Sequence, residues 1–368
     1  MARSTYCFVA LLFASAMSAQ TFIPSGFVRA GAARHEGYAV AQLGFDWQPA
    51  DWLDLHAQGI ASHFKHHDDR AGVTEAFADV HRGPLRLHAG LFFLPTSREN
   101  REDLWSSPYT ITLSAVNSWI AEELRPVGAE LSWRHGDLVT IGGTAFRGND
   151  TSGALLAWRG WQLHNRLATY GEVHPLSPLH PAFADQRADG STAFGRDLDG
   201  RLGFAGRVRV ATPERWSLQF AHVDNRGDRE LYRGEYAWQT RFNILSGELG
   251  SPDRTVLAAE WLGGKTGMGF APAGFVQMDF YAAYALLSHK RGRNRFSARY
   301  DVFATIDRDH SIAEVNTEHG RAWLFAWMFD VTPHWRAGAE FLQVVGTRAD
   351  RPPLDDRSVS VEVRYALR

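Results

Sequence analysis

The sequence predicts an all-β protein, a transmembrane antiparallel up-and-down β-barrel. Three observations predict it. Apolar and polar residues alternate with a period of two through nearly all of the 368-residue chain. Clusters of Gly, Pro, Asp and Asn divide this pattern into segments that are joined alternately by short turns and longer polar loops. After the N-terminus no apolar run is long enough to cross a bilayer as a helix, whereas a barrel strand needs apolar residues on one face only.

The first 19 residues are typical of a secretory signal peptide. Arg3 supplies the positive charge, residues 6–13 supply the apolar core, and small residues at 14–18 suit a cleavage site. A transmembrane anchor needs roughly 20 apolar residues, about twice this core. We therefore expect residues 1–19 to be removed and residues 20–368 to form the barrel. The single cysteine, Cys7, would be lost with the signal, which excludes disulfides, cysteine zinc sites and cysteine nucleophiles from the mature protein.

The segments between turns give about 18 strands. The clearest is the last, in which Val359, Val361 and Val363 share one face and polar residues alternate with them. The count is even, as in bacterial barrels, and it places both chain ends on the short-turn side. Because the segments 26–33 and 153–159 are the weakest, 16 strands is the alternative. The predicted strands are 26–33, 38–47, 52–64, 74–82, 85–94, 126–134, 138–147, 153–159, 162–171, 201–211, 215–223, 235–245, 255–263, 275–288, 295–305, 321–331, 335–345 and 357–367.

Tryptophans add support for a membrane location. Seven of them lie at predicted strand ends near the short turns, where the ring of an interfacial residue contacts lipid and its N–H contacts water. They are Trp47, Trp52, Trp133, Trp158, Trp161, Trp216 and Trp335. A soluble exported β-protein, such as a lectin, is the alternative to a barrel.

The charge balance limits the function. Lys and Arg number 39 and Asp and Glu number 41, a net charge of −2, which argues against a nucleic-acid-binding protein. A charge at the bilayer midplane costs about 2–4 kcal/mol, so we expect charged strand residues to face a water-filled lumen. The basic candidates are Arg29, Arg86, Arg134, Arg147, Arg166, Arg207, Arg209, Arg241, Arg299 and Arg364. The acidic candidates are Asp46, Asp54, Asp79, Glu130, Glu260, Asp279, Asp301, Glu340 and Glu362.

The segment 95–125 is too long for a simple connection. Its ends are rich in charge and its middle, 111–120, is apolar enough to pack against the inner wall. We expect this loop to form a constriction, with an ordinary outer loop as the alternative. The residues most strongly predicted to line the pore or bind solute are Arg98, Arg101, Arg125, Arg207, Arg209, Arg241, Arg299, Asp301, Glu130 and Asp279. Arg207 and Arg209 lie on one face with no acid between them, which favours anions.

No sequence fingerprint of an enzyme is present, and no cofactor or metal site is predicted. The cluster of His63, His66, His67, Asp68 and Asp69 carries metal-binding side chains, but a solvated loop tip is the better explanation. Without a catalytic motif, we do not expect an enzyme.

Four stretches resemble the porin superfamily that includes phosphate-selective porins and related uncharacterised proteobacterial porins. They are LFFLPTSREN (91–100), LWSSPYTITLSAVNSWIAEELRPVG (104–128), SARYDVF (297–303) and WRAGAEFLQVV (335–345). The resemblance implies a passive channel for small hydrophilic solutes or ions in the outer membrane of a Gram-negative bacterium. It also implies contact with outer-membrane lipid, a third outer loop folded into the lumen, and a homotrimer.

Two features depart from that superfamily. The chain does not end on an aromatic residue, and it has no dense ladder of Lys and Arg, so phosphate is not the predicted solute. A barrel closed by its loops at 95–125 and 172–199, with a binding or adhesion role, is the alternative function.

Overall fold

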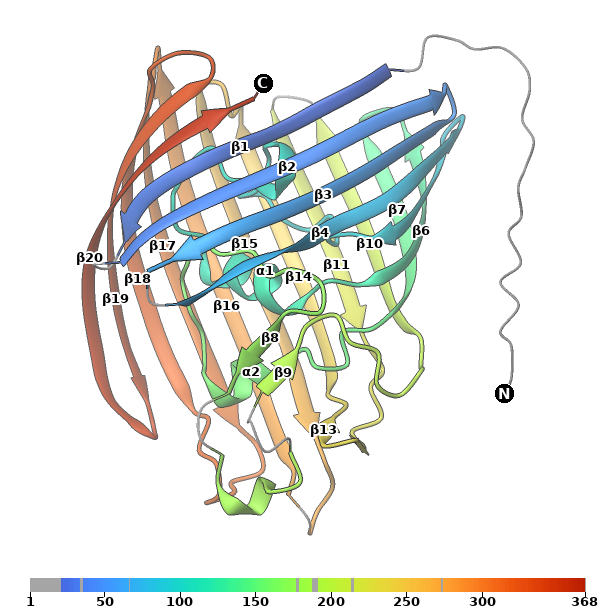
Figure 1. The fold of residues 1–368 in the computed structure, drawn as a ribbon, viewed down its shortest axis with the longest axis vertical. Helices are drawn as coiled ribbons and strands as arrows, with labels where there is room; N and C mark the ends of the chain where they lie inside the picture. The colour runs from blue at the N-terminus through green and yellow to red at the C-terminus, as the bar shows by residue number, and fades with distance from the viewer. Residues whose placement is uncertain are drawn as a thin grey trace.

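The computed structural model describes residues 21–367, apart from 34–35, 66, 177–178, 187–190, 213–214 and 273. The predicted signal peptide, residues 1–19, and His66 of the histidine cluster lie outside the described residues. Sixteen antiparallel strands form a closed barrel, in which the last strand pairs with the first (Figure 1). This confirms the fold class and the alternative count of 16 strands.

The barrel strands are β1 (Thr21–Ala33), β2 (Glu36–Ala50), β3 (Leu53–Phe64), β4 (His67–Arg82), β5 (Leu85–Leu91), β6 (Val127–His135), β7 (Val139–Arg147), β10 (Gly203–Thr212), β11 (Trp216–Asp224), β14 (Gln239–Gly250), β15 (Thr255–Met268), β16 (Val276–Arg291), β17 (Asn294–Asp307), β18 (Glu318–Asp330), β19 (Trp335–Arg348) and β20 (Arg351–Ala366). Two small hairpins pair β8 (Val173–Pro175) with β9 (Ser191–Ala193), and β12 (Leu231–Tyr232) with β13 (Glu235–Tyr236). The helices are α1 (Ala115–Glu123), α2 (Ala154–Trp158) and the 3₁₀ turns η1 (Asp103–Trp105) and η2 (Pro181–Phe183).

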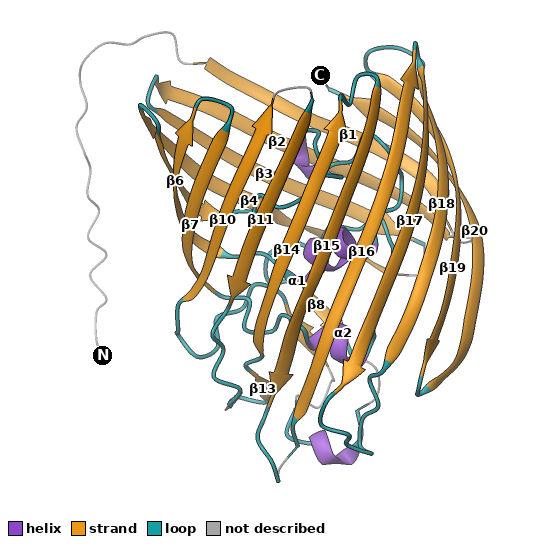
Figure 2. Ribbon diagram, turned by 180° about the vertical axis from the view of Figure 1, so that it is seen from behind, coloured by secondary structure: helices purple, strands orange, loops and turns teal. Residues whose placement is uncertain are grey.

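The two ends of the barrel differ in their connections. At one end the strands are joined by tight turns, such as 51–52, 83–84 and 292–293. At the opposite end lie the long connections 92–126 and 148–202, and the loops gather there in the view from behind (Figure 2). We call these the short-turn end and the outer end. No helix among the described residues is long and apolar enough to cross a membrane.

The two surplus strands of the sequence prediction are segments inside the barrel. Residues 154–158 form α2, and no strand is found within 162–171. Leu155, Leu156, Trp158 and Leu163 are buried there. Because the run Ala-Leu-Leu-Ala-Trp is apolar on every side, it suits a buried helical turn as well as a strand, and periodicity alone does not separate the two.

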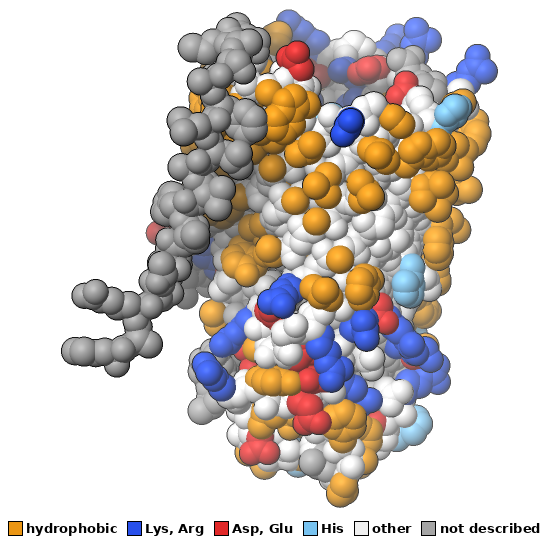
Figure 3. All heavy atoms as spheres, turned by 90° about the vertical axis from the view of Figure 1, so that its right-hand side faces the viewer, with side chains coloured by type: hydrophobic (Ala, Val, Ile, Leu, Met, Phe, Trp, Pro, Cys, Tyr) orange, Lys and Arg blue, Asp and Glu red, His pale blue; other side chains and the backbone are white. Residues whose placement is uncertain are grey.

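The outer wall carries the apolar residues expected of a membrane-facing surface. Orange hydrophobic side chains spread over the wall, whereas charged side chains gather toward the outer end (Figure 3). Five of the seven predicted interfacial tryptophans are exposed: Trp47, Trp52, Trp133, Trp216 and Trp335. The other two, Trp158 and Trp161, are instead buried in the lumen, because their segment is not part of the wall.

The inner wall is divided into two unlike halves. From β14 to β19 the inward face is largely apolar, with Ile244, Leu262, Phe280 and Leu324 in one buried cluster that includes α1 and α2 residues. From β1 to β7, and on β10, the inward face carries many charged side chains, among them Arg29, Asp79, Arg86, Glu130 and Arg207. The lumen is therefore packed on one side and polar on the other.

Candidate functional site

The loop 92–126 is folded into the barrel, where α1 contacts β15, β16 and β17 (Figure 2). Its helix begins after Ser114, whose hydroxyl oxygen accepts a hydrogen bond from the Asn117 N–H (3.2 Å), a typical N-cap. The Trp119 ring lies with its centroid 5.1 Å from that of Phe242 and 5.2 Å from that of Phe280. The apolar middle of the loop thus packs against the apolar half of the inner wall.

A fully buried ion cluster anchors this loop. The Arg299 guanidinium on β17 is paired with Asp301 (2.8 Å) and with Glu99 of the loop. It also donates to the carbonyl oxygens of Thr112 (2.8 Å) and Leu113 (3.0 Å). Arg299 and Asp301 were predicted to line the pore. The structure instead places them beneath the loop, where they have no solvent exposure, because buried loop backbone groups need fixed partners.

Two wall carboxylates hold the loop in the same way. Glu340 accepts from the backbone N–H of Ile111 (2.7 Å), and Glu260 accepts from the backbone N–H of Arg98 (3.0 Å). Both were predicted to face the lumen, and both do so, but they bind the loop.

The second long connection, 148–202, is tied to the first by two buried ionisable side chains. The Glu123 carboxylate accepts from the N–H groups of Gly153 (3.1 Å) and Leu155 (2.9 Å) at the start of α2, and burial raises the pKa of Glu123 to about 7. Arg125 donates to the carbonyl oxygens of Ala121 (3.0 Å) and Ala168 (2.8 Å), and burial lowers the pKa of Arg125 to about 9. Arg125, which was predicted to line the pore, therefore links the loop 92–126 to the connection 148–202.

Four predicted arginines gather between the loop and the polar half of the wall. Arg207 forms a bidentate ion pair with Glu130, in which Nε donates to Oε2 (2.9 Å) and Nη2 donates to Oε1 (2.7 Å). The pair borders a cavity of about 230 Å³. Arg101 is paired with Glu248, and Arg98 donates to Gln219 (3.2 Å). Burial lowers the pKa of Arg98, Glu260 opposes the shift, and the nearby charges of Arg209 and Arg101 add to it. Two of the four arginines, Arg207 and Arg101, are therefore paired with a carboxylate.

Two further candidates lie on the outer surface of the wall. Arg241 and Asp279 were predicted to face the lumen, yet their neighbours Phe242 and Phe280 contact Trp119 inside the barrel. Because neighbouring strand residues point to opposite faces, Arg241 and Asp279 face outward. Asp279 is paired there with Lys265 (3.6 Å) and Arg308 (2.7 Å). The prediction assigned the apolar side of β16 to lipid, but it packs on the folded loop.

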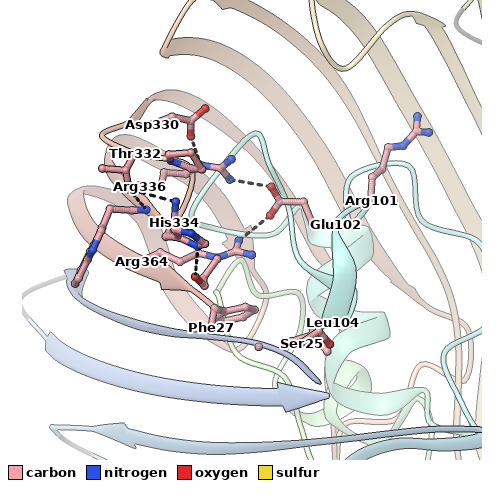
Figure 4. A pocket seen from close by; sticks show the side chains of 14 residues that line it. Ser25, Phe27, Arg101, Glu102, Leu104, Asp330, Thr332, His334, Arg336 and Arg364 are labelled. Carbon is pink, nitrogen blue, oxygen red and sulfur yellow. Dashed lines mark hydrogen bonds and ion pairs between the residues drawn. The ribbon is translucent and has the colours of Figure 1, made fainter. Parts of the chain in front are cut away.

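The polar half of the lumen contains a series of adjoining cavities. An inner cavity of about 370 Å³ lies at the short-turn end, lined by Phe27, Arg101, Glu102, Arg336 and Arg364 among others (Figure 4). A narrow waist cavity of about 40 Å³ shares Phe27 and Arg364 with it. An outer cavity of about 330 Å³ shares Asn165 with the waist. Together they follow β20, β1 and β2 from end to end.

Glu102 organises the inner cavity. Its carboxylate accepts from Arg336 (2.9 Å) and Arg364 (2.7 Å), which come from β19 and β20 (Figure 4). Burial alone would raise its pKa, but the two guanidiniums overcome this effect and hold the pKa of Glu102 to about 2. The loop is thereby fixed to the wall by charged groups that border open space.

Arg29 lines the waist cavity. Its guanidinium is paired with Glu362 on β20 (3.0 Å) and donates to the backbone oxygen of Asn165 in the second loop (2.6 Å). The Tyr38 hydroxyl donates to the same carboxylate (2.7 Å). Arg29, Glu362 and Arg364 were in the predicted lumen rows but outside the preferred set. Closure of the sheet could have singled them out, because it places Arg29 opposite Arg364.

No protein-family model matches the chain, and no curated protein matches it in sequence. Solved structures do match its fold. The outer membrane channel DcaP of Acinetobacter baumannii gives a TM-score of 0.61 at 10% identity, covering 95% of this chain and 97% of that one. An anion-selective porin from Comamonas acidovorans gives 0.57 at 10% identity, covering 95% and 100%. The trimer form of OmpT from Vibrio cholerae gives the same values. The chain has the fold of outer-membrane porins.

Proposed function

We propose that this protein is an outer-membrane porin through which small hydrophilic solutes or ions diffuse passively. The observation that carries the proposal is the series of adjoining polar cavities between the folded loop and the inner faces of β20, β1 and β2. The loop 92–126 is the constriction, and the passage lies to one side of the barrel axis because the inner faces of β14–β19 form one apolar cluster with residues of α1 and α2.

Further features support a channel in the outer membrane. The outer wall is apolar with tryptophans at its short-turn end, as interfacial anchoring requires. The fold is shared with DcaP, an outer membrane channel, and with an anion-selective porin. The proposed solutes are small, because the waist cavity is only about 40 Å³.

The passage has little excess charge. Five of its arginines are each paired with a carboxylate: Arg29 with Glu362, Arg70 with Glu172, Arg159 with Glu122, Arg336 with Asp330, and Arg364 with Glu102. Paired charges of both signs create local fields that orient polar solutes without strongly excluding either ion. We therefore assign no preference for phosphate.

One observation favours the alternative of a barrel closed by its loops. The hydrogen bond from Arg29 to the Asn165 backbone oxygen spans the waist, so the passage opens fully only when this hydrogen bond breaks. A closed barrel with a surface-binding role would show no conductance in a planar bilayer.

Deleting residues 100–120 separates the two functions. For a porin we expect measurable wild-type conductance and a larger conductance in the deletion variant, with heat-modifiable migration in gels showing that the barrel has formed. Deletion of 229–236, which removes the β12–β13 hairpin from the outer end, is the control and should leave conductance unchanged. If deletion of 100–120 also leaves it unchanged, the loop is not the constriction.

A homotrimer is the proposed assembly, supported by the trimer form of OmpT with the same fold. Light scattering of the purified protein in detergent should give three times the chain mass. A mass of one chain would remove this part of the proposal.

A further inference from the structure

Three carboxylates converge in the outer connection between β17 and β18. Asp307 is the last residue of β17, and Asp309 and Glu314 follow in the connection 308–317. One carboxylate oxygen from each lies within 4.8 Å of the other two. Glu314 is the unusual member: it is only 9% exposed, and neither of its carboxylate oxygens accepts a hydrogen bond from an N–H or hydroxyl donor among the described residues, while the Asp309 carboxylate lies beside it.

The two aspartates are held in place by backbone N–H groups. Asp307 Oδ1 accepts from the N–H of Asp309 (3.0 Å) and of His310 (2.9 Å). Asp309 Oδ1 accepts from Ser311 (2.9 Å), and its Oδ2 accepts from Gln277 at the start of β16 (2.6 Å). One Glu314 oxygen therefore lies close to two carboxylates whose positions are fixed.

Such an arrangement of three ionised groups is costly without a compensating charge. A buried carboxylate that accepts no hydrogen bond loses its hydration, and the carboxylates of Asp307 and Asp309 lie close to that of Glu314. The Arg348 guanidinium is engaged by Glu318 (3.4 Å) and Asp350 (3.1 Å). A cation bound between the three carboxylates would supply the missing charge.

We propose that Asp307, Asp309 and Glu314 form a binding site for a hard divalent cation of the Ca²⁺ class. All the donors are oxygens, which such cations prefer, and Ca²⁺ binds oxygen at about 2.3–2.6 Å. Two ligands on opposite sides of the ion are then up to about 5 Å apart, which the spacing within 4.8 Å meets. Asp307 belongs to β17, and Asp309 accepts a hydrogen bond from the Gln277 N–H of β16. A bound ion would therefore link the connection 308–317 to both strands.

Ca²⁺ titration of the purified full-length barrel, stripped of metal and held in detergent, tests this site. Isothermal titration at neutral pH should show one Ca²⁺ site per chain. Glu314→Gln should weaken binding at least as much as the about tenfold loss typical of a supporting residue, and Asp309→Asn should do the same. Asp185→Asn, which neutralises an exposed acid in another outer connection, is the control and should bind as the wild type does.

Each result decides the proposal. Absence of Ca²⁺ binding by the wild type would overturn it, as would unchanged affinity in both Glu314→Gln and Asp309→Asn. Tighter binding of Mg²⁺ than of Ca²⁺ would overturn the assigned cation class. If Glu314→Gln does not form a heat-modifiable barrel, the affinity of Asp309→Asn decides.

Discussion

Arg29 and Glu362 face each other across the line where the first and last strands pair, with Nη1 and Oε2 3.0 Å apart. They are separated by 333 residues in sequence. Because Arg29 also donates to Asn165, one side chain joins the closure of the barrel to the second lumen loop. This relationship places the narrowest part of the proposed passage at the barrel closure.

Arg29→Ala should increase single-channel conductance severalfold. The change removes the side chain that spans the waist, while Glu362 keeps the Tyr38 hydroxyl as a partner (2.7 Å), so the wall should remain folded. Planar-bilayer recording measures the effect. Arg241→Ala removes an arginine from the outward face and should conduct as the wild type does; an equal increase in both variants would rule out a specific role for Arg29.

Arg299→Ala should release the constriction loop. It leaves Asp301 and Glu99 buried without their cation, and breaking a buried pair in this way typically costs about 3–5 kcal/mol. Denaturant unfolding in lipid vesicles measures the loss, and protease cleavage within 92–126 reports on the loop itself. Arg299→Ala combined with Asp301→Asn and Glu99→Gln should recover part of the stability. A loss below about 1 kcal/mol, the range of an exposed pair, would contradict the anchor.

Glu362→Gln should shift ion selectivity toward anions. The wild type should show a reversal potential near zero in a salt gradient, because five arginines of the passage are paired with carboxylates. Removing the Glu362 charge leaves Arg29 uncompensated at the waist. Arg207→Ala changes a pair beside the cavity of about 230 Å³, which shares Leu104 with the inner cavity but no residue with the waist, and should have a smaller effect. A larger shift in Arg207→Ala than in Glu362→Gln would place the passage beside Arg207 instead.

The barrel could be predicted because its physical cause is local. The alternation of apolar and polar residues with a period of two is visible in the sequence, and so are the turn residues at 51–52 and 83–84. The two surplus predicted strands lie where apolar segments, such as 154–158, fill the lumen, whereas the other weak segment, 26–33, is part of the barrel strand β1. A sequence pattern reports that a residue is buried, but it does not report whether lipid or a folded loop covers it.

The site could be predicted only in part for the same reason. Arg98, Arg101, Arg207 and Arg209 do gather near the loop, because the loop and β10 share the polar half of the lumen. Arg241 and Asp279 were assigned to the wrong face, since the apolar side of β14 and β16 packs on α1. The roles of Arg29 and Glu102 depend on contacts between distant segments, which no local pattern encodes.

The most direct test of the central claim is modification of an introduced cysteine during current recording. Residues 21–368 contain no cysteine, so a charged thiol reagent reacts only at the new site. Ser107 borders the waist and is partly exposed, whereas Ser246 is buried on the packed half of the inner wall. The reagent should reduce the current through Ser107→Cys and leave the current through Ser246→Cys unaffected. Unchanged current through Ser107→Cys after confirmed labelling would contradict a passage along β20, β1 and β2.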